Sequence, residues 1–301
     1  MTVLTKWKNS FFKILSLHRF IAIFMTTIAI FVAYHALIWF SFTSQLLDVS
    51  PPARVGDLAR IGYQTSSVNF RLDKDSLPKK HIEFSQWKGE SIDIITIGDS
   101  FSNGGAGGEN PYYQDFIATK YDYTVMNINP SLFGENTIEA IAALYTSGLI
   151  DQIKPKAVLI ESVGRYVVSR FSKPMNWEQN ITKKALYNDL KGGKWGDGKP
   201  NKDKQYFITT ANYKLPLYNL FYLFSPNALR YSNAYKFKLS QPLFNVKDPY
   251  ALLVYQDDIG SLGGNTAKNI LTVNENLNHL SDLLSSKNIR LFFMQIGRAH
   301  V

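Results

Sequence analysis

The chain of 301 residues contains no cysteine. This absence excludes a disulfide-stabilised scaffold, a cysteine-ligated zinc or iron–sulfur site, and catalysis by a thiol. Acidic residues are missing from the first 19 positions, where Lys6, Lys8, Lys13 and Arg19 form a basic tail (residues 1–19). This tail supplies almost half of the formal net charge of +9, so the charge alone does not indicate nucleic-acid binding. Intrinsic disorder is excluded because 45% of the residues are hydrophobic and 14% are aromatic.

Charged residues are also absent from positions 20–42, FIAIFMTTIAIFVAYHALIWFSF. A helix of this length spans about 35 Å, enough to cross a hydrocarbon core of about 30 Å. The basic tail before it predicts a single-pass protein with a cytoplasmic N-terminus and its main domain in the periplasm or outside the cell. A cleaved signal peptide is the alternative, but its apolar region is normally shorter and ends in a small-x-small site that is not evident here. We interpret His35 as a tolerated polar residue near the outer interface rather than a proton relay.

The last six residues, IGRAHV, match a sequencing adaptor when they are translated back into DNA. Their back-translation matches a common sequencing adaptor whose next in-frame codon is a stop. We therefore interpret residues 295–301 as an adaptor artefact and expect the native sequence to continue beyond Met294, with a chance match as the alternative. His300 is then no candidate for a catalytic base.

Short apolar runs alternate with helix-compatible segments through most of the remaining chain. Strands are expected over residues 92–97, 123–128, 157–160 and 289–294, and helices over residues 112–120, 135–147 and 265–286. The alternation predicts an α/β domain with a mainly parallel sheet over residues 91–294, after a polar stalk and lead-in at 43–90. Residues 170–250 are rich in Tyr and Phe and are interpreted as an insertion or cap on this domain. Packing of these aromatic residues onto the domain is favoured over stacking on carbohydrate or nucleic acid.

Gly98, Asp99 and Ser100 directly follow the first expected strand, and the glycine-rich segment 103–108 follows them. Ligands of open parallel sheets bind at the carboxyl ends of the strands, so the Ser100 hydroxyl would face a crevice beside backbone N–H groups that can stabilise an oxyanion. The phosphate loop G-x-x-x-x-G-K-[ST], the dinucleotide motif G-x-G-x-x-G and the elbow G-x-S-x-G are all absent from this segment. A simpler role for Ser100 is that of a helix N-cap.

With its strand, the Gly-Asp-Ser motif resembles the first sequence block of the SGNH (GDSL-type) hydrolase superfamily. Two further segments, VMNINPSLFGENT at 125–137 and VLIESVGRY at 158–166, are similar to the membrane-associated branch of the AlgX/AlgJ type, which acetylates alginate. The resemblance implies a flavodoxin-like, three-layer SGNH fold after one transmembrane helix, with Ser100 as nucleophile and the backbone N–H of Gly134 in the oxyanion hole. It covers residues 91–170 well, and 265–294 only in pattern.

The sequence also departs from this family. The third-block Asn is missing, and Glu161 and Arg165 stand in its region, where a structural ion pair is favoured over a substrate role. With Asp99 they are assigned as substrate-binding or structural residues. No Asp-x-His motif precedes the serine, since His81 lacks that Asp. In most of the superfamily the catalytic Asp and His follow the last strand, and His279 is interpreted as a residue of a helix surface.

The resemblance therefore implies a membrane-anchored serine O-acyltransferase or esterase that acts on an exported or cell-surface polysaccharide through an acyl-Ser100 intermediate. The acyl donor and the choice between transfer and hydrolysis stay open, and the chain as written is expected to be inactive without its Asp and His. The alternative is a non-catalytic relative that binds glycan or serves in assembly. No metal and no cofactor are expected, because no ligand spacing is visible, and export argues against a nucleic-acid partner.

Overall fold

The computed structural model describes residues 3–46, 57–63, 75–105, 109–193, 206–228, 232–243 and 249–297. The basic tail, the stalk and the adaptor-like end therefore fall partly outside the described residues. His300 lies wholly outside them.

A five-stranded parallel sheet forms the centre of the α/β part, as the alternating apolar runs predict. The four predicted strands are all present, as β2 (Ile94–Ile97), β3 (Val125–Asn127), β4 (Ala157–Val163) and β7 (Arg290–Ile296). The fifth, β1 (Ile82–Glu83), comes from the expected lead-in and pairs with β3. The spatial order is β1-β3-β2-β4-β7. Because the chain runs from β2 to β3 on one side and then to β4 on the other, a topological switch point lies between β2 and β4.

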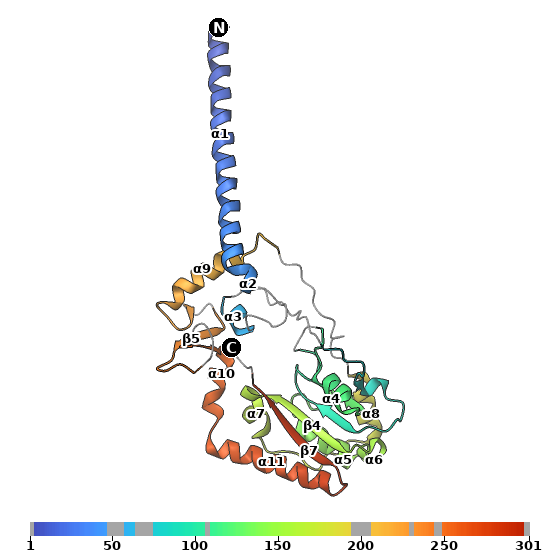
Figure 1. Cartoon of the computed structure of the whole chain (residues 1–301). Helices are drawn as coiled ribbons and strands as arrows, with labels where there is room; N and C mark the ends of the chain where they lie inside the picture. The colour runs from blue at the N-terminus through green and yellow to red at the C-terminus, as the bar shows by residue number, and fades with distance from the viewer. Residues whose placement is uncertain are drawn as a thin grey trace.

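Helices cover the two faces of this sheet unequally (Figure 1). The helices of the α/β part are α4 (Tyr113–Tyr121), α5 (Thr137–Thr146), α6 (Ile150–Ile153), α7 (Gly164–Phe171), α8 (Lys183–Gly192), α10 (Gln256–Ser261) and α11 (Ala267–Ser285). Right-handed crossovers place α4 on one face and both α5 and α11 on the other. On the second face, Ile95, Val158 and Ile160 are buried in one core with Ile141 and Leu284. The predicted helices at 112–120, 135–147 and 265–286 are thus confirmed to within a few residues.

The face that carries α4 is open over β4 and β7 in the described part of the chain. Leu159 is partly exposed, and 47% of Phe292 is exposed. A groove of about 600 Å³ runs here between Tyr121 of α4 and Arg290 of β7. The three-layer arrangement is therefore complete over β3 and incomplete over the β7 edge.

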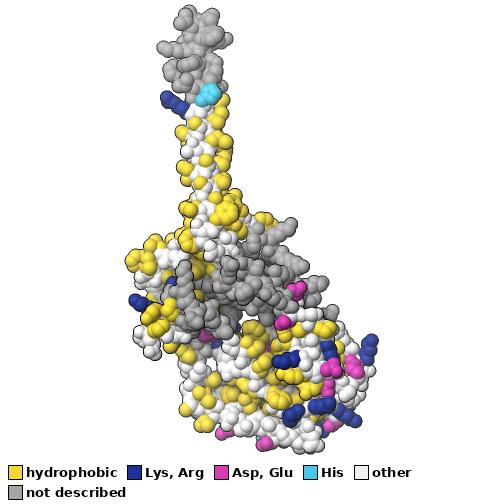
Figure 2. Space-filling model, in the orientation of Figure 1, with side chains coloured by type: hydrophobic (Ala, Val, Ile, Leu, Met, Phe, Trp, Pro, Cys, Tyr) yellow, Lys and Arg dark blue, Asp and Glu magenta, His cyan; other side chains and the backbone are white. Residues whose placement is uncertain are grey.

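The first helix, α1 (Val3–Ile38), continues into a π-helical turn, η1 (Trp39–Thr43), and a short α2 (Ser44–Leu46). Residues Leu17–Leu46 are long and apolar enough to cross a membrane. Their most apolar 18-residue stretch has a mean hydropathy of 2.2, and only 11% of that stretch is buried. Hydrophobic side chains accordingly cover the described part of the α1 column and continue onto the surface beside its base (Figure 2). The apolar helix predicted at 20–42 is present and extends beyond both limits.

The structure divides the aromatic-rich segment 170–250 between two places. Its first helix, α8, contacts α5 in the α/β part, whereas α9 (Ala211–Tyr222) contacts η1 at the base of α1. The antiparallel hairpin of β5 (Ala234–Lys238) and β6 (Ala251–Tyr255) contacts α3 (Asp57–Gly62), also near that base. The second half of the segment therefore lies between α1 and the sheet rather than over the sheet (Figure 1).

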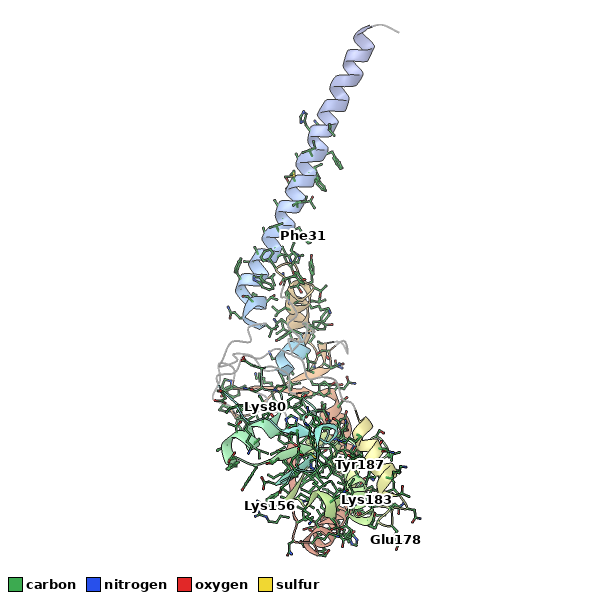
Figure 3. The ribbon with its side chains drawn as sticks, turned by 90° about the vertical axis from the view of Figure 1, so that its right-hand side faces the viewer. Phe31, Lys80, Lys156, Glu178, Lys183 and Tyr187 are labelled. Carbon is green, nitrogen blue, oxygen red and sulfur yellow. The ribbon has the colours of Figure 1, made fainter. Side chains whose placement is uncertain are left out.

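His35 joins α1 to α9. Its Nε2 lies 2.8 Å from the hydroxyl of Tyr213, and its Nδ1 lies 2.7 Å from Nδ2 of Asn212. The hydroxyl of Tyr34 donates to the carbonyl of Asn212 at 2.8 Å. His35 is fully buried and both ring nitrogens have partners, so it is a structural contact rather than a residue that is merely tolerated. Figure 3 shows Phe31 just above this contact.

We expect Asn212→Ala to loosen this junction, because it leaves one buried nitrogen of His35 without a partner. Such a loss costs about 1–3 kcal/mol. Hydrogen exchange of the α9 amides should become faster, while exchange in α11 stays unchanged. The matched control is Asn274→Ala, since Asn274 is exposed on α11. Equal exchange in α9 for the wild type and Asn212→Ala would mean that these bonds do not hold the junction.

Candidate functional site

A pocket of about 250 Å³ lies at the carboxyl ends of β2 and β4. This is the switch point of the sheet, where open α/β sheets bind their ligands. The pocket is lined by the five site residues chosen from the sequence, which are Asp99, Ser100, Gly134, Glu161 and Arg165. They come from segments up to 66 positions apart in the chain (99 to 165) and meet because adjacent parallel strands end at the same edge.

Ser100 is exposed at the start of a turn that follows β2. Its carbonyl accepts hydrogen bonds from the backbone N–H groups of Asn103 at 3.1 Å and Gly105 at 2.6 Å. Glycine is needed at 105 because an added Cβ would lie 2.6 Å from the Ser100 carbonyl oxygen. The next helix begins only at Tyr113, so the interpretation of Ser100 as a helix N-cap is wrong. The turn leaves its side chain at the pocket.

Glu161 of β4 forms the floor of the pocket and is almost fully buried. Its Oε2 accepts hydrogen bonds from the backbone N–H of Asp99 at 3.0 Å and from the hydroxyl of Ser102 at 2.9 Å. Its Oε1 has no hydrogen-bond partner among the described residues. Gly98 makes this approach sterically accessible, since a Cβ there would lie 2.4 Å from Oε2.

Burial and the nearby negative charge of Asp99 raise the pKa of Glu161 to about 7, against the opposing hydrogen bonds from Ser102 and the Asp99 N–H. A carboxyl group with this pKa exchanges its proton close to neutral pH, which is the range that general acid–base catalysis requires. A perturbed group in a cleft is also a recognised indication of a functional site.

The same shift predicts the pH dependence of stability. Because the pKa of Glu161 is higher in the folded chain than its ordinary 4.5, the folded state binds more protons between about pH 4.5 and 7. Stability should therefore fall as the pH rises through this window, on account of this group. Glu161→Gln should remove that fall and raise the melting temperature above pH 7, because the neutral amide has no charge to desolvate.

Melting curves at intervals from pH 4.5 to 8 would measure this effect. The control is Glu139→Gln, a change at a carboxylate outside the pocket on α5. If the Glu161→Gln and Glu139→Gln profiles have the same slope, Glu161 does not titrate near neutrality.

Asp99 holds the end of β2 to the end of β4 and to α7. Its Oδ2 accepts from the backbone N–H of Val163 at 2.9 Å and from Nη1 of Arg170 at 2.7 Å, and its Oδ1 accepts from the N–H of Phe101 at 3.2 Å. Burial opposes the charge, but Arg170 and these N–H groups outweigh it and lower the pKa of Asp99. Arg170 also bonds the hydroxyl of Ser162 at 2.8 Å. These contacts give Asp99 a positioning role.

Arg165 stands at the start of α7, and its side chain is 11% exposed. Its guanidinium lies over the rings of Tyr166 and Tyr255, at 4.8 and 5.3 Å. Its Nη1 is 3.6 Å from Asp258 of α10, and neither Nε nor Nη1 has a hydrogen-bond partner among the described residues. The expected ion pair with Glu161 is wrong, because Glu161 turns toward β2 while Arg165 turns toward α10. Both nitrogens are buried, so a ligand oxygen would reach them only after this side chain moves.

Gly134 lies in the turn between β3 and α5, with a φ of +53°. Its N–H donates a long hydrogen bond of 3.4 Å to the carbonyl of Ser131. A Cβ at this position would meet nothing within 4 Å, so the open side of the turn faces the pocket without obstruction. Use of this N–H for an oxyanion would require it to leave the Ser131 carbonyl.

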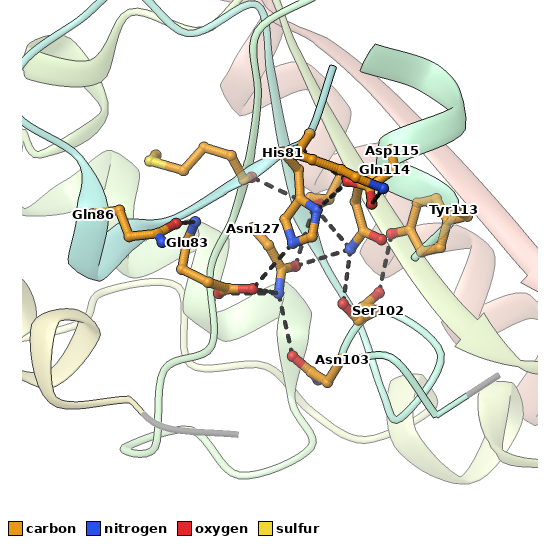
Figure 4. Close-up of polar contacts among 12 residues, drawn as sticks. His81, Glu83, Gln86, Ser102, Asn103, Tyr113, Gln114, Asp115 and Asn127 are labelled. Atoms are coloured by element: carbon orange, nitrogen blue, oxygen red, sulfur yellow. Dashed lines mark hydrogen bonds and ion pairs between the residues drawn. The ribbon is translucent and has the colours of Figure 1, made fainter. Parts of the chain in front are cut away.

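A second polar cluster lies beside the pocket (Figure 4). Nδ1 of His81 is 2.7 Å from Oδ1 of Asp115 in α4, and its Nε2 is 3.3 Å from Glu83. Burial disfavours the imidazolium, but Asp115 and Glu83 outweigh it and raise the pKa of His81 to about 9. Of the pair His81 and Asp115, the sequence pointed only to the histidine. Its aspartate was missed because the two residues are 34 positions apart.

The cluster reaches the loop after Ser100 but not the pocket. The amide of Asn127 donates to Glu83 and, at 3.2 Å, to Oδ1 of Asn103. Gln114 donates to the carbonyl of Ser102 at 2.8 Å. His81 and Asp115 are not among the residues that line the pocket. The cluster therefore holds the loop from the α4 side, while Asp99 holds it from the α7 side.

His279 lies on α11, and its ring packs at a tilt against Trp177 at 4.2 Å between ring centroids. It does not line the pocket. The described residues hold no group of three or more His, Asp or Glu that could bind a metal ion.

No family model, curated protein or solved structure matches this chain. The functional interpretation therefore depends on its own residues. These are an exposed serine at the switch point of a parallel sheet, a buried carboxyl group with a raised pKa and an arginine with unused donors, all in one pocket.

Proposed function

We propose that this chain is a membrane-anchored, SGNH-like serine O-acyltransferase or esterase that acts on an exported or cell-surface polysaccharide. The observation that carries this proposal is the position of Ser100, which is exposed at the carboxyl end of β2 in the pocket at the switch point. The resemblance of Gly98-Asp99-Ser100 and of residues 125–137 and 158–166 to the SGNH superfamily supports the same chemistry.

In the proposed reaction, Oγ of Ser100 attacks the carbonyl carbon of an acyl ester and loses its proton to a base. The alkoxide of the donor leaves with a proton, and the acyl group stays on Ser100. Attack by a sugar hydroxyl or by water then releases it, so transfer and hydrolysis share the first step. The N–H groups of Ser100 and Gly134 would stabilise the oxyanion in both steps.

Two groups are candidates for the base that accepts the proton of Ser100. No histidine lines the pocket within the described ranges, and the carboxyl group there that titrates near pH 7 is Glu161. The family resemblance instead implies an Asp and a His after the last strand. Glu161→Gln separates the two assignments, because it abolishes turnover only if Glu161 accepts the proton of Ser100.

The membrane helix and the pocket support an extracytoplasmic polymer as substrate. The four basic residues in the first half of α1 favour a cytoplasmic N-terminus, which would place the α/β part outside. Arg165 lines the pocket and would bring its positive charge to a hydroxyl or carboxylate oxygen of a sugar unit. The proposal names both partners by chemical class: an exported or cell-surface polysaccharide and an acyl ester as donor.

A non-catalytic glycan-binding protein is the second candidate. It is favoured by the arrangement of His81, whose ring nitrogens are engaged by Asp115 and Glu83 rather than directed at Ser100. Retention of an exposed serine beside Glu161 is the observation against it.

The test uses the protein expressed from its genomic gene. Hydrolysis of p-nitrophenyl acetate and release of acetate from an acetylated polysaccharide are measured together with glycan affinity. Turnover of either ester supports the enzyme. Glycan binding without turnover of either ester would replace the enzyme with the binding protein.

A further inference from the structure

The helix α9 at the base of α1 is apolar on two sides. Its first stripe, Ala211, Leu215 and Tyr218, is buried against the protein. The second stripe, on the opposite side, is exposed and consists of Tyr213, Leu217, Leu220 and Phe224, the last in the turn just after the helix, with the C-cap residue Leu223 beside it. Their spacing of four, three and four residues places them along one helix face.

The exposed stripe is unusually apolar for a surface in water. The exposed fractions are 46% for Leu217, 50% for Leu220, 77% for Leu223 and 80% for Phe224. Lys214 is the one charged residue within α9, and the helix contains no acidic residue. A helix that is apolar on most of its circumference is normally covered by protein or by lipid.

The junction with α1 fixes where this helix lies relative to a bilayer. His35 follows Arg19 by 16 residues, a distance of about 24 Å along a helix, so it would still lie inside a hydrocarbon core of about 30 Å. The contacts of Asn212 and Tyr213 with His35 hold the first turn of α9 at that level. The ring of Phe207, just before α9, also packs at a tilt against Trp39, at 6.1 Å between ring centroids.

From this point α9 runs sideways from α1 rather than along it (Figure 1). The hydrophobic surface of α1 continues onto this region without a charged break in Figure 2. An apolar helix that leaves a membrane helix sideways at the level of the outer interface has the geometry of an interfacial helix.

We propose that α9 is a second membrane contact, which buries Leu217, Leu220, Leu223 and Phe224 in the outer surface of the same bilayer. This rests on α1 spanning the membrane, and it is independent of the chemistry at Ser100. With α9 in the interface and α1 across the bilayer, the chain has two points of attachment. The α/β part is then held at a fixed tilt instead of swinging on a single helix.

The absence of cysteine makes a direct test simple, because single cysteines can be introduced and spin-labelled without background. The full chain is reconstituted into vesicles of phosphatidylethanolamine and phosphatidylglycerol. Leu220→Cys and Leu223→Cys report on α9, Ile30→Cys reports on the membrane helix, and Leu271→Cys on α11 is the matched control in water. The exposed fractions of Ile30 and Leu271 are 65% and 60%, similar to those of the α9 sites.

The readout is the ratio of label accessibility to oxygen, which concentrates in lipid, and to a water-soluble nickel chelate. We expect the ratio at Leu220 and Leu223 to be several-fold above that at Leu271 and to approach that at Ile30. A ratio at both α9 sites equal to that at Leu271, with Ile30 shielded from nickel, would overturn the α9 contact alone. Nickel access at Ile30 would overturn the spanning helix and the α9 contact together. Exclusion of both reagents from the α9 sites would mean that protein covers this face, and would also overturn it.

Discussion

Ser100→Ala is expected to abolish ester hydrolysis and acyl transfer by the protein expressed from its genomic gene, lowering kcat by a factor of about 10³ or more. The loss follows because, within the described part of the chain, Ser100 is the one serine that lines the pocket with Glu161. The side chain of Ser100 forms no hydrogen bond within the described structure, so its removal should leave the melting temperature almost unchanged. The combination of lost activity and kept stability distinguishes a nucleophile from a structural residue.

The control for this variant is Ser285→Ala, a change at an exposed serine in the last turn of α11. It should keep full activity. Ser102→Ala gives a second comparison, because Ser102 is buried and donates to Glu161. That variant should lower stability as well as activity. Activity of Ser100→Ala equal to that of Ser285→Ala would exclude the acyl-Ser100 mechanism.

Arg170→Met is expected to have the largest effect on stability. The side chains of Arg170 and Asp99 are 8% and 12% exposed, so the variant leaves a carboxylate buried without its partner. Removal of one member of a buried ion pair costs about 3–5 kcal/mol of unfolding free energy. For a domain of this size, the melting temperature should fall by about 10 °C. The contact of Arg170 with Glu135 adds little, because Glu135 is 74% exposed.

The surface pair of Lys287 and Asp151 provides the comparison, and Lys287→Met should cost less than about 1 kcal/mol. The double variant Asp99→Asn/Arg170→Met should recover part of the loss, since it no longer buries a lone charge. Thermal unfolding of the variants at pH 7 measures both effects. A change for Arg170→Met as small as that for Lys287→Met would show that this pair does not hold β2, β4 and α7 together.

The sheet was predictable because each of its long strands is a short apolar run bounded by turn residues. The run at 92–97 became β2, and the run at 289–294 became β7, with the expected parallel pairing. The two-residue strand β1 gave no signal, since its pairing with β3 depends on a tertiary contact rather than on an apolar pattern. Periodicity reports which face a segment buries, not which neighbour it meets.

The site was partly predictable for a related reason. Ser100 follows β2 and Glu161 lies in the second half of β4, and the carboxyl ends of neighbouring parallel strands must converge. The contacts of the charged side chains around the site were not predictable, as Arg165 and Asp115 show. Arg165 pairs with Asp258 instead of Glu161, and Asp115 reaches His81 across 34 positions, because side-chain direction on α7 and α4 decides both contacts.

The most direct test of acyl transfer at Ser100 is to trap the nucleophile. The protein expressed from its genomic gene is incubated with a fluorophosphonate, digested and analysed by mass spectrometry, with Ser100→Ala treated in parallel. Acyl transfer at Ser100 predicts one phosphonylated serine, in the peptide that contains Ser100, and no adduct in Ser100→Ala. An unmodified protein, or an adduct on another serine that persists in Ser100→Ala, would contradict Ser100 as the nucleophile.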